Sequence, residues 1–274
     1  MKLLIAVDME GITGVVNWDH VTPSHAEYQR FRHLMTADVN AAICGAADAG
    51  VEEIIVSDGH WSGTNLLIEE LDPLARLNCG SPAPFSMVQG ANQKIDAAFF
   101  IGYHAHIGSQ NAILDHTWSS TAVANVWLND RIAGEIGLNA AVCGAFDAPV
   151  LMVSGDQTAI AEARDWLGEI ETAVVKQASG RFAAECLPPP VTQKLIRESA
   201  TRAVRRYMKG RAPAPLKVDL PVTVTVEFTY SNMADLAAML PGAARLDARK
   251  VAYTAADMPT AYRAFRSLVG LGNK

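Results

Sequence analysis

Apolar runs alternate with helix-periodic stretches along the first two thirds of the chain. The runs KLLIAVD, EEIIVSD, PVLMVSGD and TAVVKQ, together with residues 96–103, are typical of strands buried on both faces. Helical periodicity is predicted for residues 24–50, 65–71, 134–148 and 157–167. Strands that alternate with helices in this way predict a layered α/β/α domain with a mostly parallel sheet.

The pattern changes at Pro188-Pro189-Pro190. A basic helix is predicted from there to about residue 209, followed by an alternating strand at 222–229, a strand at 249–255 and a helix at 259–271. We therefore expect a metal-binding catalytic α/β domain at 1–187 and a smaller α+β domain at 188–274. The second segment contains no histidine, so its expected role is to shape or cover the site and to take part in oligomer contacts.

Three of the apolar runs end in two side chains able to bind a metal, separated by one residue. These pairs are Asp8 and Glu10, Asp58 and His60, and His104 and His106. Residues at i and i+2 of an extended chain point to the same face, so each pair aims at one spot beyond its strand. Ligands bind beyond the carboxyl ends of the strands in open α/β sheets. The three pairs together predict a metal site assembled from neighbouring strands.

Each pair alone also has an ordinary structural explanation. An Asp-x-Glu after a strand can cap a helix, Asp-Gly is a common turn element, and His104 alone can be a hydrogen-bonded core histidine. Their joint occurrence favours the metal site, although spacing does not separate a ligand from a neighbour that orients it. Asp58 and His106 are the members of the pairs for which a supporting role is equally open.

The mixture of carboxylates and imidazoles indicates which metal such a site would hold. Histidine ligands favour zinc over Mg²⁺ or Ca²⁺, and this number of ligands suits a catalytic or dinuclear centre. A carboxylate such as Asp8 could bridge two ions that together polarise a substrate oxygen and activate water.

Two further residues stand out by their surroundings. Glu135 lies among small apolar residues in AGEIGLNA, where an acid is costly unless it is paired or ligated. His116 follows the apolar stretch after residues 96–103, and from the residues alone a loop histidine and a catalytic one are equally open.

The composition of the chain argues against several classes of partner and site. The 274-residue chain has a net charge of −6 and no dense cluster of Lys and Arg, which argues against a nucleic-acid partner. No apolar run is long enough for a membrane span or for the core of a signal peptide. Its four cysteines are widely spaced and form no Cys-x-x-Cys pair, so we expect a reduced, cytoplasmic setting and no thiolate zinc site.

Two other classes of protein compete with a metal-dependent hydrolase that uses all these residues. DMEGIT at 8–13 looks like the strand end of haloacid-dehalogenase phosphatases, in which Asp8 would accept a phosphoryl group and Mg²⁺ would assist. That interpretation leaves His60, His104 and Glu135 without a role. The other alternative is a non-catalytic oligomeric peptide-binding protein that retains a metal. The chain has no Gly-x-Ser-x-Gly elbow and no phosphate-binding P-loop.

A set of motifs in register along the chain resembles the zinc D-aminopeptidase family, typified by the D-aminopeptidase of bacterial dipeptide-transport operons. The motifs are AVDMEGITG at 6–14, SDGH at 57–60, PFSMVQG at 84–90, GYHA at 102–105, NDRIAGEIGLNA at 129–140 and PVLMVSGD at 149–156. His106 lies outside the matching pattern, and the loop at 107–114 differs, so the alignment onto His116 depends on one small gap.

The resemblance implies an aminopeptidase with two zinc ions per subunit, acting on short peptides or amides with an N-terminal D-residue, such as D-Ala-D-Ala. It places the metal ligands at Asp8, Glu10, His60, His104 and Glu135, and the catalytic residue, a nucleophile or general acid/base, at His116. It also implies a ring-shaped homodecamer that encloses the active sites and admits only small peptides.

Overall fold

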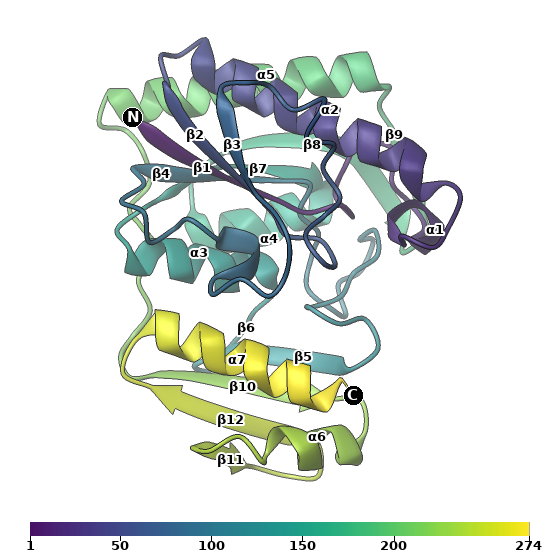
Figure 1. Cartoon of the computed structure of the whole chain (residues 1–274), viewed down its shortest axis with the longest axis vertical. Coiled ribbons are helices and arrows are strands. Elements are labelled where there is room, and N and C mark those ends of the chain that lie inside the picture. Colours follow the sequence, from purple (N-terminus) through teal and green to yellow (C-terminus); the bar gives the residue numbers. More distant parts are fainter. Residues whose placement is uncertain (274) are drawn as a thin grey trace.

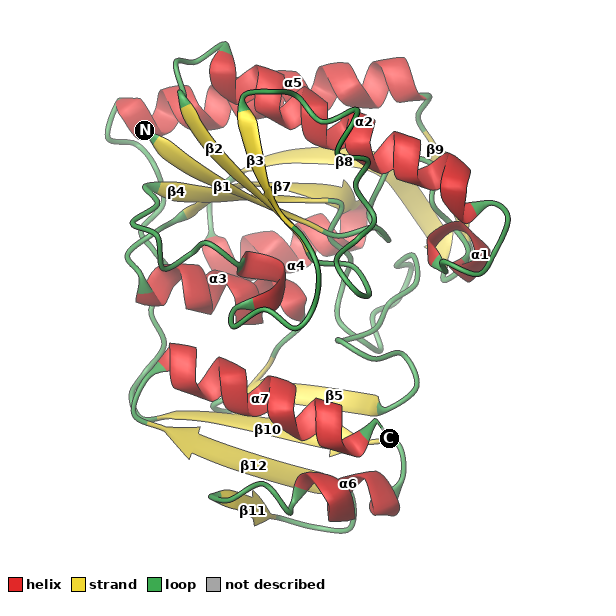
Figure 2. Cartoon of the chain, in the orientation of Figure 1, coloured by secondary structure: helices red, strands yellow, loops and turns green. Residues whose placement is uncertain are grey.

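The computed structural model describes residues 1–273, and its larger sheet has seven strands in the order β3-β2-β1-β4-β7-β8-β9 (Figures 1 and 2). Neighbouring strands are parallel, except that β9 runs antiparallel to β8. The strands are β1 (Lys2–Val7), β2 (Glu53–Asp58), β3 (Ala75–Asn78), β4 (Ala97–Ile101), β7 (Val150–Asp156), β8 (Glu171–Gly180) and β9 (Ala183–Cys186). The predicted mostly parallel sheet is confirmed.

Helices cover both faces of this sheet. On one face lie α2 (Tyr28–Ala47) and α5 (Pro189–Met208), and on the other α3 (Glu135–Ala145) and α4 (Gln157–Leu167), as Figure 2 shows. Along β1, Leu3 and Ile5 join the core under α2 and α5, whereas Leu4 and Ala6 join the core under α3 and α4. Because β1 is buried on both faces, it reads as an unbroken apolar run, and the predicted α/β/α layering is confirmed.

A second, antiparallel sheet has five strands in the order β11-β12-β10-β5-β6. Its strands are β5 (Val123–Leu128), β6 (Arg131–Ile132), β10 (Val222–Phe228), β11 (Ala243–Arg245) and β12 (Lys250–Ala255), with helices α6 (Ser231–Ala237) and α7 (Met258–Gly272). Alternate residues of β10 are buried, as its sequence predicts, and α7 packs on the sheet. The same core joins Phe265 of α7 to Ile136 of α3, so the two sheets share apolar packing.

The two sheets do not divide the chain at the predicted residue 188. Strands β5 and β6, from the first 187 residues, belong to the five-stranded sheet, while α5, from beyond residue 188, packs against α2 and β8. The reason is pairing between distant segments, since β5 lies antiparallel to β10 with Val224 opposite Leu128. This pairing leaves no mark in the local sequence pattern.

The helix predicted at 65–71 is wrong, because this segment forms turns. The backbone amides of Asn65 and Leu66 donate to Asp58 Oδ2 at 2.6 and 2.8 Å, and that of Leu67 donates to Thr36 Oγ1 at 3.1 Å. These side-chain acceptors take the place of helical carbonyls. Among the helices of residues 1–273, none has the length and apolar character needed to cross a bilayer.

Candidate metal centre

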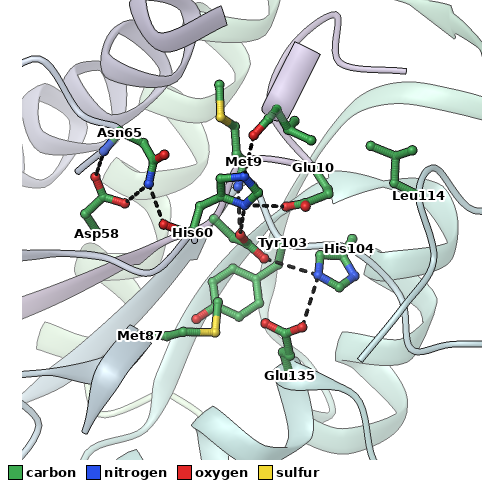
Figure 3. A network of polar contacts seen from close by, with 12 residues as sticks. Met9, Glu10, Asp58, His60, Asn65, Met87, Tyr103, His104, Leu114 and Glu135 are labelled. Carbon is green, nitrogen blue, oxygen red and sulfur yellow. Dashed lines mark hydrogen bonds and ion pairs between the residues drawn. The ribbon is translucent and has the colours of Figure 1, made fainter. Parts of the chain in front are cut away.

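The strand-end residues converge because the strands that precede them are neighbours. Asp8 and Glu10 follow β1, His60 follows β2 and His104 follows β4, and β1 lies between the other two strands. Glycines let the backbones approach closely here: a Cβ on Gly11 would overlap the carbonyl oxygen of Tyr103. The carboxyl ends of three parallel strands therefore point their side chains into one space (Figure 3).

The donor atoms of the site form two sets that share one carboxylate. In the first set, His60 Nδ1 lies 3.3 Å from Asp8 Oδ1 and 3.2 Å from Glu10 Oε2. In the second, His104 Nε2 lies 3.2 Å from Asp8 Oδ2 and 3.4 Å from Glu135 Oε1. All five side chains are buried. The two oxygens of Asp8 thus face different imidazoles, and each imidazole also faces a second carboxylate.

These separations suit metal ligands better than hydrogen bonds. A charge-assisted hydrogen bond is about 2.7–2.9 Å long, whereas two ligands of one tetrahedral zinc ion, each about 2.0–2.1 Å from it, lie about 3.3 Å apart. Asp8 Oδ2, Glu10 Oε2 and His104 Nε2 are buried without a hydrogen-bond partner among the described residues. Buried polar atoms rarely lack a partner, so the donor set fits a bound cation.

Backbone carbonyls orient the two imidazoles. His60 Nε2 lies 2.8 Å from the carbonyl oxygen of Val21, and His104 Nδ1 lies 3.0 Å from that of Ala105. A carbonyl only accepts, so these nitrogens are the donors. The opposite nitrogen of each ring points toward the carboxylates and offers a lone pair there whenever the ring is neutral. This is the arrangement in which protein imidazoles bind metals.

The electrostatics of the cluster also call for a cation. Burial lowers the pKa of His60 and His104, but the charges of Glu10 and Glu135 and the contacts with Asp8 outweigh it and raise both pKa values well above their usual range. Burial would raise the pKa of Asp8, yet the two imidazoles hold it well below its usual range. The cluster therefore binds positive charge, which protons or a divalent metal can supply.

Glu135 comes from outside the strand ends. It is the first residue of α3, where the positive end of the helix dipole stabilises a carboxylate. Its Oε1 also accepts a hydrogen bond of 2.7 Å from the backbone amide of Trp118. The apolar surroundings of this acid in the sequence predict that it is paired or ligated, and Glu135 lies beside His104, another predicted ligand.

His116 lies beside the cluster and lines the cavity in front of it. Its ring stacks on that of His104 with 4.1 Å between centroids, and its Nε2 lies 3.9 Å from Glu135 Oε1. Nδ1 lies 2.9 Å from the carbonyl oxygen of Leu114 and therefore donates to it. Burial, and next to it the charge of His104, lowers the pKa of His116, which leaves a neutral ring with a free lone pair on Nε2.

The remaining members of the pairs lie outside both donor sets. Asp58 accepts from Asn65, whose side-chain amide donates to the carbonyl oxygen of His60 at 2.6 Å, so Asp58 stabilises the turn that holds His60. His106 Nδ1 contacts the carbonyl oxygen of Ile107 at 2.7 Å, and its backbone amide donates to Glu162. Each therefore supports a loop of the site.

Lys176 is a buried cation of the site region that none of the sequence motifs indicates. From β8 its Nζ donates to the carbonyl oxygens of Glu10, Ile12 and Val15 at 2.6, 2.9 and 2.7 Å. Burial lowers its pKa to about 8, so the ammonium remains charged at neutral pH with all three donors in use. The available signal was a lysine in the otherwise apolar run TAVVKQ. Lys176 fixes the loop that presents Glu10.

We expect Lys176→Met to lower the free energy of unfolding by about 3–5 kcal/mol, because the carbonyls of the loop lose a buried donor. Denaturant titration measures this loss. The control is Gln177→Met, which changes the next, exposed position of β8 and should shift stability by less than about 0.5 kcal/mol. An equally small shift for Lys176→Met would show that Lys176 does not fix the loop.

A cavity of about 720 Å³ opens in front of the cluster. Asp8, Glu10, His60, His116 and Glu135 line its inner wall. The rest of the wall comes from both parts of the fold, including Trp18 and Trp61 beside the larger sheet and Arg266 and Val269 of α7. This volume suits a small-molecule ligand rather than a folded protein.

Comparison with known proteins agrees with a hydrolytic site. The sequence profile described as D-aminopeptidase matches residues 1–267, which places the protein among the peptide hydrolases. The chain belongs to the D-aminopeptidase family. Membership over nearly the whole chain favours this class over both the phosphatase and the non-catalytic binding protein.

A sequence match and a structural match show how far the similarity extends. The D-aminopeptidase of Bacillus subtilis (strain 168) is 38% identical over 265 residues, which cover 96% of this chain and 95% of the relative. The solved structure of the Zn-dependent D-aminopeptidase DppA from Bacillus subtilis, described as a self-compartmentalizing protease, superimposes with a TM-score of 0.95. That match has 35% identity and covers 100% of this chain and 98% of the other.

Proposed function

We propose that this protein is a dinuclear zinc aminopeptidase that removes the N-terminal D-amino acid from short peptides or amides such as D-Ala-D-Ala. The observation that supports two ions is the division of the Asp8 carboxylate between two imidazoles, 3.3 Å from His60 Nδ1 and 3.2 Å from His104 Nε2. A single ion would need only one of these sets.

The donor set supports zinc. Asp8, Glu10 and His60 would hold one ion, and Asp8, His104 and Glu135 the other, which matches the carboxylate and imidazole ligands of catalytic zinc sites. DppA, to which the chain is similar, is Zn-dependent. When bound, the two ions supply Lewis acidity toward the scissile carbonyl and toward the attacking water.

His116 is the residue that we propose for proton transfer. Its neutral ring, fixed by the carbonyl of Leu114, presents Nε2 to the cavity beside Glu135. In our proposal Nε2 accepts the proton of the attacking water and delivers it to the departing amine, the role of a general base and then a general acid. The backbone amide of Trp118 keeps Glu135 in place while this occurs.

The proposed preference for D-residues and the proposed assembly rest on membership of the D-aminopeptidase family. We propose a homo-oligomer, in the form of a ring-shaped decamer that encloses the sites, and a cytoplasmic location; DppA is described as self-compartmentalizing. Ten chains of 29.3 kDa give a particle of about 293 kDa, which analytical ultracentrifugation would resolve from smaller assemblies. A monomer or dimer at working concentration would contradict the ring.

The function is tested with zinc-loaded protein and matched D- and L-aminoacyl dipeptides and amides. We expect hydrolysis of D-Ala-D-Ala, much slower hydrolysis of L-Ala-L-Ala, and loss of activity on chelation that returns with zinc. Failure on all D-substrates would refute the proposed specificity, and Mg²⁺-dependent release of phosphate from phosphomonoesters would favour the phosphatase.

A further inference from the structure

The described residues that line the cavity include one arginine and no lysine, and the arginine is Arg266 of α7. The acids that line the cavity, Asp8, Glu10 and Glu135, all belong to the donor cluster. A ligand in this space therefore meets the metal-binding cluster in one region and a guanidinium in another. This division of charge matches a molecule that carries a carboxylate away from its reacting end.

The position of Arg266 is fixed, yet Nη2 of its guanidinium has no hydrogen-bond partner among residues 1–273. Nη1 donates to the backbone carbonyls of Ala83 and Pro84. The guanidinium carbon also lies 5.9 Å from the ring centroid of Trp118. Nε is buried without a hydrogen-bond partner, and within residues 1–273 no acidic side chain forms an ion pair with Arg266. Protein atoms cover Nε, so Nη2 is the nitrogen left for a ligand.

A carboxylate is the group that Nη2 recognises best. The N–H groups of Nη2 carry part of the guanidinium charge, so their bonds to carboxylate oxygens are charge-assisted. A guanidinium without an anionic partner in the protein therefore favours a ligand that supplies one. An uncharged amide offers one acceptor oxygen and adds donors that would face the guanidinium.

The site is connected to the cluster through Trp118. The same residue that lies under the Arg266 guanidinium donates its backbone amide to Glu135 Oε1 at 2.7 Å. Arg266 is thus linked to a predicted metal ligand through one residue, Trp118.

We propose that Arg266 binds the free C-terminal carboxylate of the substrate and so selects peptides short enough to end inside the cavity. This inference rests on the proposed function, because it takes the reacting end of the peptide to lie at the donor cluster. It adds a specificity determinant from α7, which packs on the five-stranded sheet. The enzyme is then expected to prefer D-Ala-D-Ala to the same dipeptide with an amidated C-terminus.

The kinetic test compares D-Ala-D-Ala with D-Ala-D-Ala amide in zinc-loaded enzyme. We expect the wild type to favour the free acid, and Arg266→Met to lower kcat/KM for the acid by about 10–150-fold and for the amide by less than about 3-fold. Arg266→Lys keeps the positive charge but loses the planar guanidinium, so its kcat/KM for the acid should lie between the values of the wild type and of Arg266→Met. Arg263→Met, an exposed arginine of the same helix, is the matched control and should leave both rates unchanged.

A purely structural role of Arg266, through the carbonyls of Ala83 and Pro84, would lower the two rates equally, and that result overturns the proposal. A wild type without preference for the acid overturns it as well. Binding of the same acid and amide to zinc-loaded His116→Ala protein, measured by calorimetry with and without Arg266→Met, requires no turnover. This binding measurement shows whether Arg266 recognises the carboxylate even if no D-substrate is hydrolysed and the proposed function fails.

Discussion

Asp8→Ala is expected to remove both zinc ions and to lower kcat/KM for D-Ala-D-Ala by on the order of 10³-fold or more. Its two oxygens face His60 and His104 separately, so the substitution takes one donor from each set. Loss of several kcal/mol of Lewis-acid stabilisation in the transition state corresponds to a rate loss of that size. Zinc content is measured by atomic spectroscopy on protein dialysed against a weak chelator.

Substitutions that remove a donor from only one of the two sets are the best comparison for Asp8→Ala. Glu10→Ala removes a donor from the set of His60, and Glu135→Ala one from the set of His104, so each should retain about one ion per chain. Asp19→Ala, which removes an exposed acid, should retain both ions. Two ions retained by Asp8→Ala would contradict a shared carboxylate, and a wild type with one ion would contradict the dinuclear centre.

The strand-end part of this site was predictable because it depends on local sequence and on one general property of parallel sheets. Apolar runs identify β1, β2 and β4, and i, i+2 spacing places polar side chains at their carboxyl ends. The topology then makes these three strands neighbours, with β1 in the middle. The sequence alone did not reveal how Asp8 divides its oxygens, because that depends on side-chain positions from three strands.

Contacts between distant segments account for most of what the sequence did not reveal. Strand β5 has a weak local pattern and is fixed by pairing with β10, about a hundred residues later in the chain. Lys176 and Arg266 are held in position by backbone carbonyls far away in sequence, at Glu10 and at Ala83. The failed helix at 65–71 has this origin only in part. Thr36 accepts from the backbone amide of Leu67 across a separation of 31 residues, whereas the acceptor for Asn65 and Leu66 is the nearby Asp58.

His116→Ala is expected to lower kcat by about 10²–10⁴-fold while both zinc ions remain bound. The reason is that its Nε2 faces the cavity with a free lone pair, while its distance of 3.9 Å from Glu135 Oε1 exceeds the 3.2–3.4 Å that separates the nitrogens of His60 and His104 from their carboxylates. His116→Gln should be equally slow, since an amide cannot transfer the proton. His106 lies outside the donor sets, so His106→Ala should change kcat by less than His116→Ala does.

Zinc content decides between proton transfer and metal binding for His116. Its ring nitrogen, His104 and Glu135 offer ligand atoms within 4.8 Å of one another, so a ligand role predicts loss of about one ion in His116→Ala. Retention of both ions with a slow chemical step assigns proton transfer to His116. Unchanged peptide hydrolysis would remove His116 from the mechanism and leave the two donor sets to act without it.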